Sequence, residues 1–295
     1  MDRGDQHRRD EAWLEERTLD PDTKFLLMPG LEVPLSDGTA PSLRWLNADD
    51  LNGLAVDGPP VFLGLQDGRA HFAVYVPKTD GAAEELTSDK SIVFSDARRA
   101  ATILALQETG IVAQARAQLD WHNRHGFCSV CGAPTEMGRG GHVRQCPECN
   151  AQHFPRTDPV AIMLVHDGDR CLLGQSRGRL SRMRMYSALA GFIDQGESIE
   201  EAVAREVKEE AGIEVKNVRY HSSQPWPFPS SLMIGCHAEA VTTDISIDSE
   251  EMADVQWFDR EELLLALEGR SERLSVPQPL AIAHHLIKTW ATKTI

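Results

Sequence analysis

One stretch of the chain, residues 191–213, constrains its fold and chemistry more than any other. Apolar residues recur there at steps of three and four, which is the spacing of a helix that lays one face on a core. These residues are Ile199, Ala202, Val203, Val207 and Ala211. Ser198 with Glu201 forms a capping box, and Gly212 follows as a C-terminal cap. The pattern predicts a helix over 198–211.

Acidic residues crowd one side of this predicted helix. Glu206, Glu209 and Glu210 stand at i, i+3 and i+4, so their carboxylates face the same way and repel one another. A solvated charged face is the usual explanation for a Glu-rich helix. Converging carboxylates also form an oxygen-rich site for Mg²⁺ or Mn²⁺. Arg205 stands beside them, where it would orient and partly neutralise the cluster.

The complete pattern decides between these two explanations. Gly191, five residues, Glu197, seven residues and then 205–213, REVKEEAGI, resemble the Nudix box at every specified position. Such a match at fixed spacing arises by chance on the order of once in 10⁹ windows. The resemblance implies a hydrolase of a nucleoside diphosphate linked to another group, acting with divalent metal ions.

The chemistry of a pyrophosphate agrees with this implication. Its negative oxygens repel a nucleophile, and bound cations neutralise them and stabilise the leaving phosphate. We therefore expect Glu206 and Glu210 to hold the metal. Glu209 is either a further ligand or the group that takes the proton from water, and the sequence leaves both open. We expect Glu197 to orient the loop and Arg205 rather than to contact metal.

Composition limits the other classes of function. The chain has 295 residues and a net charge of −15, which disfavours sequence-independent binding along nucleic acid because such binding relies on Lys and Arg. It contains no apolar run of 18 residues, and its first residues are charged rather than basic and then apolar. We therefore expect no membrane span, no secretory signal and a cytoplasmic location.

Four cysteines in two CxxC pairs predict a separate module. They are Cys128, Cys131, Cys146 and Cys149. Two such pairs around a short, polar, Gly-rich segment are typical of a zinc ribbon. Disulfides or free core thiols are the alternative, which a reducing cytosol disfavours. Because four thiolates leave no position for water, we expect a structural Zn²⁺. A ribbon that binds nucleic acid is a further alternative, which the acidic net charge disfavours.

The rest of the chain predicts strands and helices around these two segments. Before the ribbon, we expect a small α/β domain with strands in 25–28, 61–65 and 71–76, the last two joined at Asp67-Gly68, and a helical pattern over 95–122 broken near Gly110. After it, we expect strands at 159–165, 171–174, 215–220, 232–240 and 255–258, and helices at 260–267 and 279–290. The expected domains are 1–125, 126–156 and 157–295.

Residues 223–231, SQPWPFPSS, follow ten residues after the box. Three prolines alternate with Trp226 and Phe228. Because each proline lacks an N–H and fixes its own φ, we expect neither a ladder strand nor a helix here. A stiff loop of this kind presents two aromatic faces for stacking on a flat heterocycle. Taken alone, such a loop is more often a packed corner or a partner-binding segment.

Together, the box, the four cysteines before it and SQPWPFPSS after it resemble the NADH pyrophosphatase family of Nudix hydrolases, over about 121–295. The resemblance implies an α/β fold: a Nudix α/β/α sandwich preceded by a small zinc ribbon and an N-terminal α/β domain. It implies hydrolysis of NADH or NAD⁺ to nicotinamide mononucleotide and AMP, a need for Mg²⁺ or Mn²⁺, and a homodimer. Removal of NAD caps from RNA is the alternative task. A binding module with a vestigial Nudix domain is the alternative in another class, and the intact Glu set argues against it.

The resemblance also implies roles for individual residues. Glu251 corresponds to a further metal-binding Glu, and Ala190 to a residue that offers the metal its backbone carbonyl. Phe154 and Phe192 correspond to aromatic residues that sandwich a base, and Ala283 to a backbone contact with substrate. The substrate pocket is expected along Gln224, Pro225, Trp226, Pro227, Phe228, Pro229, Ser230 and Ser231.

Overall fold

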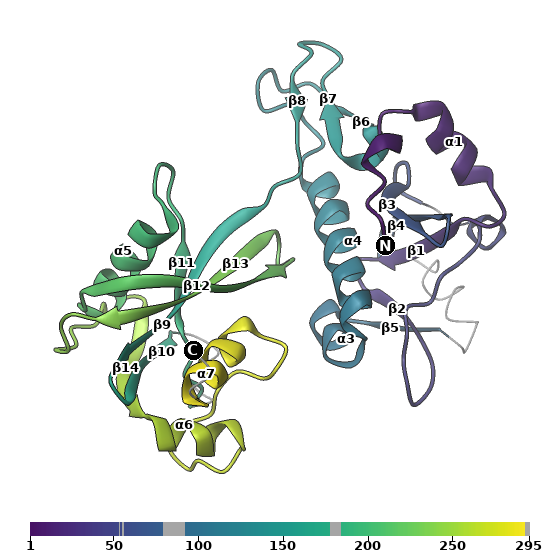
Figure 1. Cartoon of the computed structure of the whole chain (residues 1–295). Coiled ribbons are helices and arrows are strands. Elements are labelled where there is room, and N and C mark those ends of the chain that lie inside the picture. The colour runs from purple at the N-terminus through teal and green to yellow at the C-terminus, as the bar shows by residue number, and fades with distance from the viewer. Residues whose placement is uncertain (53, 55, 79–91, 178–183, 293–295) are drawn as a thin grey trace. The chain divides into compact units, whose positions relative to one another are not determined.

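The structure, a computed structural model, describes residues 1–52, 54, 56–78, 92–177 and 184–292 (Figure 1). The chain forms two compact units. The first comprises Met1–Arg156 with Pro227–Ser230, and the second comprises Thr157–Trp226 with Ser231–Ile295. Among the described helices, none has the length and the apolar run that crossing a bilayer requires.

A six-stranded mixed sheet forms the centre of the second unit. Five strands follow the order β12-β13-β9-β10-β14, and β11 also pairs with β9. The strands are β9 Asp158–Asp167, β10 Arg170–Ser176, β11 Leu189–Phe192, β12 Val215–Trp226, β13 Ser231–Ala240 and β14 Met252–Asp259. β13 runs parallel to β9, and the other pairs are antiparallel. The strands expected after the ribbon are confirmed, with wider bounds.

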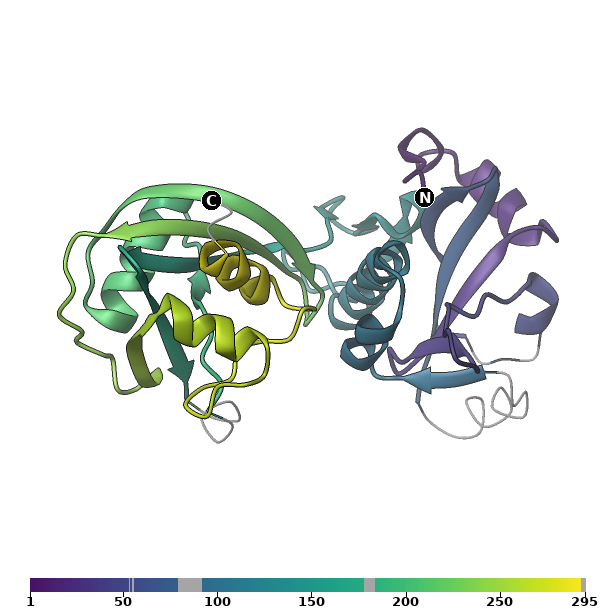
Figure 2. The same cartoon turned by 60° about the horizontal axis from the view of Figure 1, so that its bottom comes forward.

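Side chains alternate along the central strands, so the two faces of this sheet pack against different helices. Met163 of β9 packs with α5 (Ile199–Ala211). Its neighbour Leu164 points to the opposite face, which α6 (Arg260–Leu267) and α7 (Ile282–Ala291) cover. Figure 2 shows the yellow helices α6 and α7 in front of the sheet and α5 behind it. The expected α/β/α sandwich is confirmed.

On one side of β9, two different strands pair with its two halves, and this arrangement positions the candidate site. Residues 160–163 of β9 pair with β11, whereas residues 165–167 pair with β10. β10 pairs with β14 along its whole length, and only its first three residues, 170–172, also pair with β9. β11 packs against α5 and brings Gly191 directly against the carboxylate of Glu206.

The first unit contains a smaller mixed sheet in the order β1-β4-β3, with β1 parallel and β3 antiparallel to β4. A second pair of strands, β2 with β5, is antiparallel. The bounds are β1 Lys24–Pro29, β2 Val33–Ser36, β3 Val61–Gln66, β4 Arg69–Val76 and β5 Ile92–Ser95. The hairpin expected at Asp67-Gly68 is confirmed, because β3 and β4 meet there. The ribbon adds three short antiparallel strands, β6 Glu136–Gly138, β7 Val143–Gln145 and β8 Gln152–His153.

The helices of the first unit correct one prediction. The described helices there are α1 Glu11–Leu19, α3 Ala97–Ile103 and α4 Leu106–Arg124, with 3₁₀ turns at Asp5–His7, Ala48–Leu51 and Arg139–Gly141. The break expected near Gly110 falls instead at Leu104 and Ala105, whose backbones are extended. A glycine inside a helix costs only about 1 kcal/mol. Packing of Val112, Ala115 and Leu119 against the sheet outweighs that cost.

Candidate functional site

Helix α5, which carries the acidic residues, is capped at both ends as predicted. The Ser198 hydroxyl accepts from the Glu201 N–H at 3.2 Å, and the Glu201 carboxylate accepts from the Ser198 N–H at 2.8 Å. Gly212 ends the helix with a φ of 73° and donates its N–H to the carbonyl of Lys208. The helix that presents the carboxylates is therefore fixed at both termini.

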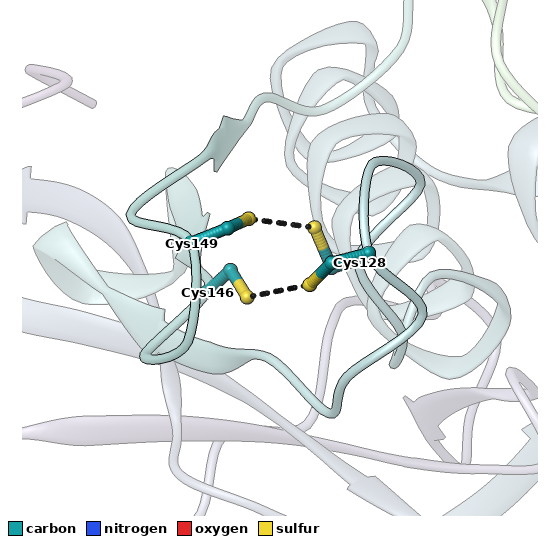
Figure 3. A group of neighbouring side chains, drawn as sticks. Cys128, Cys146 and Cys149 are labelled. Atoms are coloured by element: carbon teal, nitrogen blue, oxygen red, sulfur yellow. Dashed lines mark hydrogen bonds between the residues drawn. The ribbon is translucent and has the colours of Figure 1, made fainter.

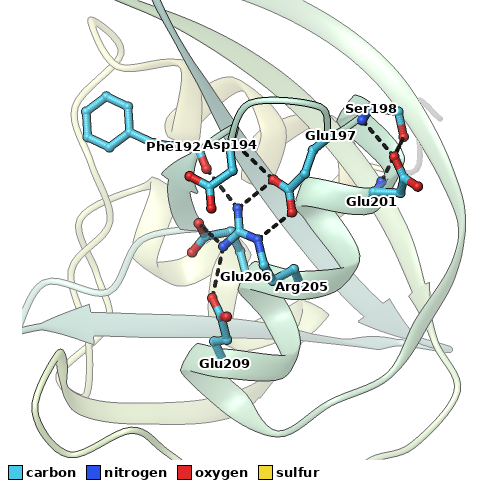
Figure 4. Close-up of polar contacts among 8 residues, drawn as sticks. All are labelled: Phe192, Asp194, Glu197, Ser198, Glu201, Arg205, Glu206 and Glu209. Carbon is cyan, nitrogen blue, oxygen red and sulfur yellow. Dashed lines mark hydrogen bonds and ion pairs between the residues drawn. The ribbon is translucent and has the colours of Figure 1, made fainter.

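Arg205 lies at the centre of the acidic cluster (Figure 4). Its Nε and Nη2 donate to the two carboxylate oxygens of Glu197 at 2.6 and 2.8 Å. Nη1 donates to Glu206 at 2.8 Å and to Glu209 at 2.9 Å. Nη2 also donates to the carbonyl of Phe192 at 2.9 Å. One guanidinium thus ties the loop before α5 to two carboxylates on the helix.

Glu197 is directed at this guanidinium and at its own loop. Hydrogen bonds from Arg205 are the main reason that the pKa of Glu197 falls to about 2, and the Asp194 N–H, which donates at 3.0 Å, lowers it further. Glu197 is therefore ionised at neutral pH, and both of its oxygens accept from N–H groups. Direct metal ligation by Glu197 would have to displace these bonds.

Glu206 and Glu210 are desolvated, with exposed fractions of 9% and 6%. Burial raises the pKa of both groups, to about 8 for Glu210, and the negative charge of Glu251 raises both further. Among the described residues, Glu210 Oε2 has no hydrogen-bond partner. Buried like charges of this kind destabilise the ionised forms, and a bound cation would relieve that cost.

Residue 191, the first of the box, is a glycine because the Glu206 carboxylate lies directly against its backbone. A Cβ at this position would overlap the carboxylate of Glu206, so any larger residue would push the carboxylate away from β11. Ala190, its neighbour on β11, lies beside Glu210, and its backbone partly offsets the rise in the pKa of that carboxyl group. The sequence showed that a glycine belongs to the pattern but not which side chain needs the space.

The donor set suits a hard divalent cation, because carboxylate oxygens are the ligands that Mg²⁺ and Mn²⁺ prefer. The charge of Glu251 is close enough to Glu206 and Glu210 to raise the pKa of both. These three carboxylates converge less tightly than the ribbon cysteines, which form the single described cluster whose ligand atoms all lie within 4.8 Å of one another. Arg205 holds Glu206 and Glu209 with N–H donors.

The four cysteines form the second candidate site (Figure 3). Their sulfurs all lie within 4.8 Å, with Cys128 Sγ 3.6 Å from Cys149 Sγ and Cys131 Sγ 3.5 Å from Cys146 Sγ. Burial opposes ionisation of Cys128, but N–H groups from the ribbon turn and the His153 ring lower its pKa to about 6. Four sulfurs so placed fit the closed tetrahedral shell of structural zinc.

The segment 223–231 overturns the expectation that it forms no ladder strand. Its first residues belong to β12, where Gln224, Pro225 and Trp226 pair with β13. The reason is that β12 is the edge strand of the sheet, and on an edge every second N–H faces away from the ladder, so Pro225 costs no ladder hydrogen bond. Ser231 already begins β13.

Gln224 anchors the start of α7. Its Nε2 donates to the carbonyl of Leu280 at 2.7 Å, and its Oε1 accepts from the Ile282 N–H at 2.8 Å. Both ends of the amide are therefore used by backbone, just before the buried Ala283. The sequence suggested a substrate contact for Gln224 and Ala283 and missed the link between them.

The turn Pro227–Ser230 belongs to the first unit. The guanidinium carbons of Arg98 and Arg116 lie 4.1 and 4.9 Å from the Phe228 ring centroid, and Arg116 Nη1 donates to the carbonyl of Pro227 at 2.9 Å. Phe228 therefore packs against two cations. Nothing in the local sequence linked these arginines to the motif, which also contains Pro229 in a cis peptide bond.

Phe154 and Phe192 lie in different units, with exposed fractions of 57% and 59%. Both rings are thus accessible to a ligand, and their pairing around one base stays a prediction.

Family models match three consecutive parts of the chain. Residues 22–121 match the NADH pyrophosphatase-like rudimentary NUDIX domain, residues 123–154 the NADH pyrophosphatase zinc ribbon domain, and residues 155–277 the NUDIX domain.

Relatives with named activities match over most of the chain. NAD-capped RNA hydrolase NUDT12 of Homo sapiens is 38% identical over 332 residues, which cover 98% of this chain and 71% of that protein. NAD-capped RNA hydrolase NudC of Mycobacterium bovis is 39% identical and covers 80% of this chain and 77% of its own. Mitochondrial NAD(P)H pyrophosphatase NUDT13 of Homo sapiens is 41% identical, and the match covers 71% of this chain and 62% of that protein. Together with the ordered domains and the acidic cluster on α5, these matches show that the chain belongs to the NADH pyrophosphatase family of Nudix hydrolases.

Proposed function

We propose that this protein is a metal-dependent diphosphatase that hydrolyses NADH or NAD⁺ to nicotinamide mononucleotide and AMP. The observation that carries the proposal is the buried pair Glu206 and Glu210 on α5, each with a raised pKa. Negative charge is concentrated there at a cost to the fold, which is typical of a site that receives cations. The names of the relatives support NAD-derived substrates.

Glu206, Glu210 and Glu251 would hold Mg²⁺ or Mn²⁺, with the Ala190 carbonyl as a further ligand. When bound, such a cation neutralises phosphate oxygens and lowers the pKa of a coordinated water. Zn²⁺ in the ribbon would have a structural role, because four cysteines close its shell.

The side chains around the metal site have separate tasks in this proposal. Glu197 orients Arg205, and Arg205 holds Glu206 and Glu209 in place. Glu209 is the most exposed of the three clustered carboxylates Glu206, Glu209 and Glu210, with 57% of its side chain accessible. We assign Glu209 as the group that accepts the proton from the attacking water, because its carboxylate is solvent-accessible and is held in place by Arg205.

Trp226, Phe154 and Phe192 would each offer a ring for stacking on a substrate base, and residues 224–231 would contribute to substrate binding. NAD-capped RNA is the second candidate substrate, since both NUDT12 and NudC are named as hydrolases of it. A cytoplasmic homodimer is also proposed. Exposed Phe127, Val130 and Phe154 on and beside the ribbon support dimerisation, which light scattering would check, and cell fractionation would check the location.

The test is hydrolysis of NADH by the purified protein with and without Mg²⁺ or Mn²⁺, with products separated by chromatography. We expect equal amounts of AMP and reduced nicotinamide mononucleotide, and only with metal. Comparing kcat/KM for NADH with that for NAD-capped RNA separates the two candidate substrates. Absence of metal-dependent products from both would refute the proposed reaction.

A further inference from the structure

A cavity of about 470 Å³ lies within the first unit, and none of its lining residues belongs to the acidic cluster. Its walls come from β3, β4, α4 and the ribbon strands β6 and β7. This volume lies in the range of sites that bind small molecules and cofactors. The matched domains assign no ligand to this part of the chain beyond the zinc ribbon.

Arg144 lines the cavity, and three contacts hold its guanidinium in place. Its Nε donates to the Thr135 hydroxyl and its Nη2 to the Thr135 carbonyl, both at 2.7 Å. Its Nη1 lies 3.1 Å from His122 Nδ1. His122 Nε2 lies 2.9 Å from the Gly141 carbonyl, so the ring proton belongs on Nε2 and Nδ1 accepts from Arg144.

The charge of Arg144 has no counterpart among the described residues. Its three partners are neutral, and no described carboxylate forms an ion pair with it. Burial lowers its pKa, and no nearby acid is among the causes that act on it. A guanidinium has five N–H donors, so the contacts to Thr135 and His122 leave two for a ligand. A half-buried cation with neutral partners is satisfied best by an anionic group.

Other residues that line the cavity are apolar or acidic. Val61 and Leu119 are buried apolar side chains, and the half-buried ring of Tyr75 stands beside them. Together they offer a surface for a flat ring. At the rim, Asp57 and Glu136 are exposed carboxylates. They would accept hydrogen bonds from hydroxyls and repel a second anionic group, which selects a ligand with its negative charge at one end.

We propose that this cavity binds a nucleoside monophosphate. The phosphate contacts Arg144, the base lies against Tyr75 and Leu119, and the ribose hydroxyls face Asp57 and Glu136. The inference stands independently of the proposed hydrolysis, because none of these residues belongs to the acidic cluster.

Isothermal titration calorimetry with AMP, without added Mg²⁺ or Mn²⁺, tests the proposal. We expect one AMP per chain in the full-length protein, and a loss of affinity of about tenfold or more in Arg144→Met, because a charge-assisted contact is removed. Arg139→Met, in the same ribbon hairpin but outside the cavity, serves as the matched control and keeps the wild-type affinity. Inorganic phosphate alone should bind more weakly than AMP, since it lacks the ring.

Two further variants keep the test decisive. Arg144 also ties ribbon residues together, so Arg144→Met is checked for zinc content and melting temperature. Asn123→Trp, at an exposed rim position on α4, removes no described contact and should block AMP sterically. Glu210→Gln separates the two sites, because it should leave binding in the cavity intact. AMP binding that is absent, that survives both cavity variants, or that is lost in Glu210→Gln overturns the proposal.

Discussion

Helix α5 in the second unit and helix α4 in the first occupy similar positions in similar frameworks and carry opposite chemistry. Each packs an apolar face against a mixed sheet that contains one parallel strand pair. The first unit, moreover, matches a rudimentary NUDIX domain. On α5, acidic side chains converge around Arg205. On α4, Gln114 and Gln118 are neutral, and the buried carboxylate of Asp120 is paired with Arg124.

Gln114 and Gln118 stand four residues apart on α4, and the Nε2 of each has a neutral partner, whereas neither buried Oε1 has one among the described residues. Gln114 Nε2 donates to the Leu63 carbonyl at 3.2 Å, and Gln118 Nε2 lies 3.2 Å from His142 Nδ1. These contacts tie the helix to its own domain. The comparison shows that this framework does not dictate chemistry: the side chains on one helix face decide whether the helix serves as a site or as a support.

Glu210→Gln gives the largest expected effect. It tests whether the buried carboxyl group of Glu210 serves turnover without stabilising the fold. We expect turnover of NADH to fall on the order of 10³-fold, because a metal ligand supplies several kcal/mol to the transition state. We expect no loss of melting temperature, since burial already disfavours the ionised form of Glu210 and the amide of glutamine carries no charge. Glu200→Gln, at an exposed position of the same helix, is the control. Full turnover in Glu210→Gln would remove this residue from the mechanism.

Gln114→Glu makes the reciprocal change on α4. The new carboxylate would face the Leu63 carbonyl with an acceptor oxygen. That carbonyl would lose the hydrogen bond that Gln114 Nε2 now donates to it. We expect the free energy of unfolding to fall by about 2 kcal/mol, measured by urea denaturation. Gln107→Glu, at the exposed start of α4, should change it by less than about 0.5 kcal/mol. Equal stability of the two variants would show that α4 tolerates charge as α5 does.

Mild acid should affect the first unit through two half-buried histidines, His122 and His142, and this is the smallest of the three effects. Burial lowers the pKa of His122 and of His142 to about 4. An unfolded histidine titrates near about 6.5, so between these values the unfolded chain binds more protons than the folded one. Stability of the first unit is therefore unaffected at higher pH and falls as the pH drops from about 6.5 toward about 4.

Hydrogen exchange of first-unit amides at about pH 7.5 and about pH 5 measures this effect. Opening should be more frequent at the lower pH, after correction for the intrinsic exchange rate. His142→Gln should reduce the difference. A pH-independent opening free energy would mean that neither histidine is kept neutral by the fold.

The local features of the candidate site were predictable from sequence, because they depend on residues close together in the chain. The span of α5, its caps and the convergence of Glu206, Glu209 and Glu210 follow from the 3.6-residue period. The four-cysteine cluster follows from two CxxC turns. Glu251 was placed near this cluster by resemblance alone, and its charge does act on Glu206 and Glu210.

Contacts between distant segments were decided by the tertiary structure. The sequence by itself determined the helix that carries the carboxylates, the ribbon and most of the strands. Strand order placed Pro225 on an edge, where a proline is tolerated, and the pairing of β11 with β9 brought Gly191 against Glu206. Gln224 reaches Ile282 across 58 positions of the chain. Periodicity governs neighbours along one element, whereas such contacts depend on which elements the core brings together.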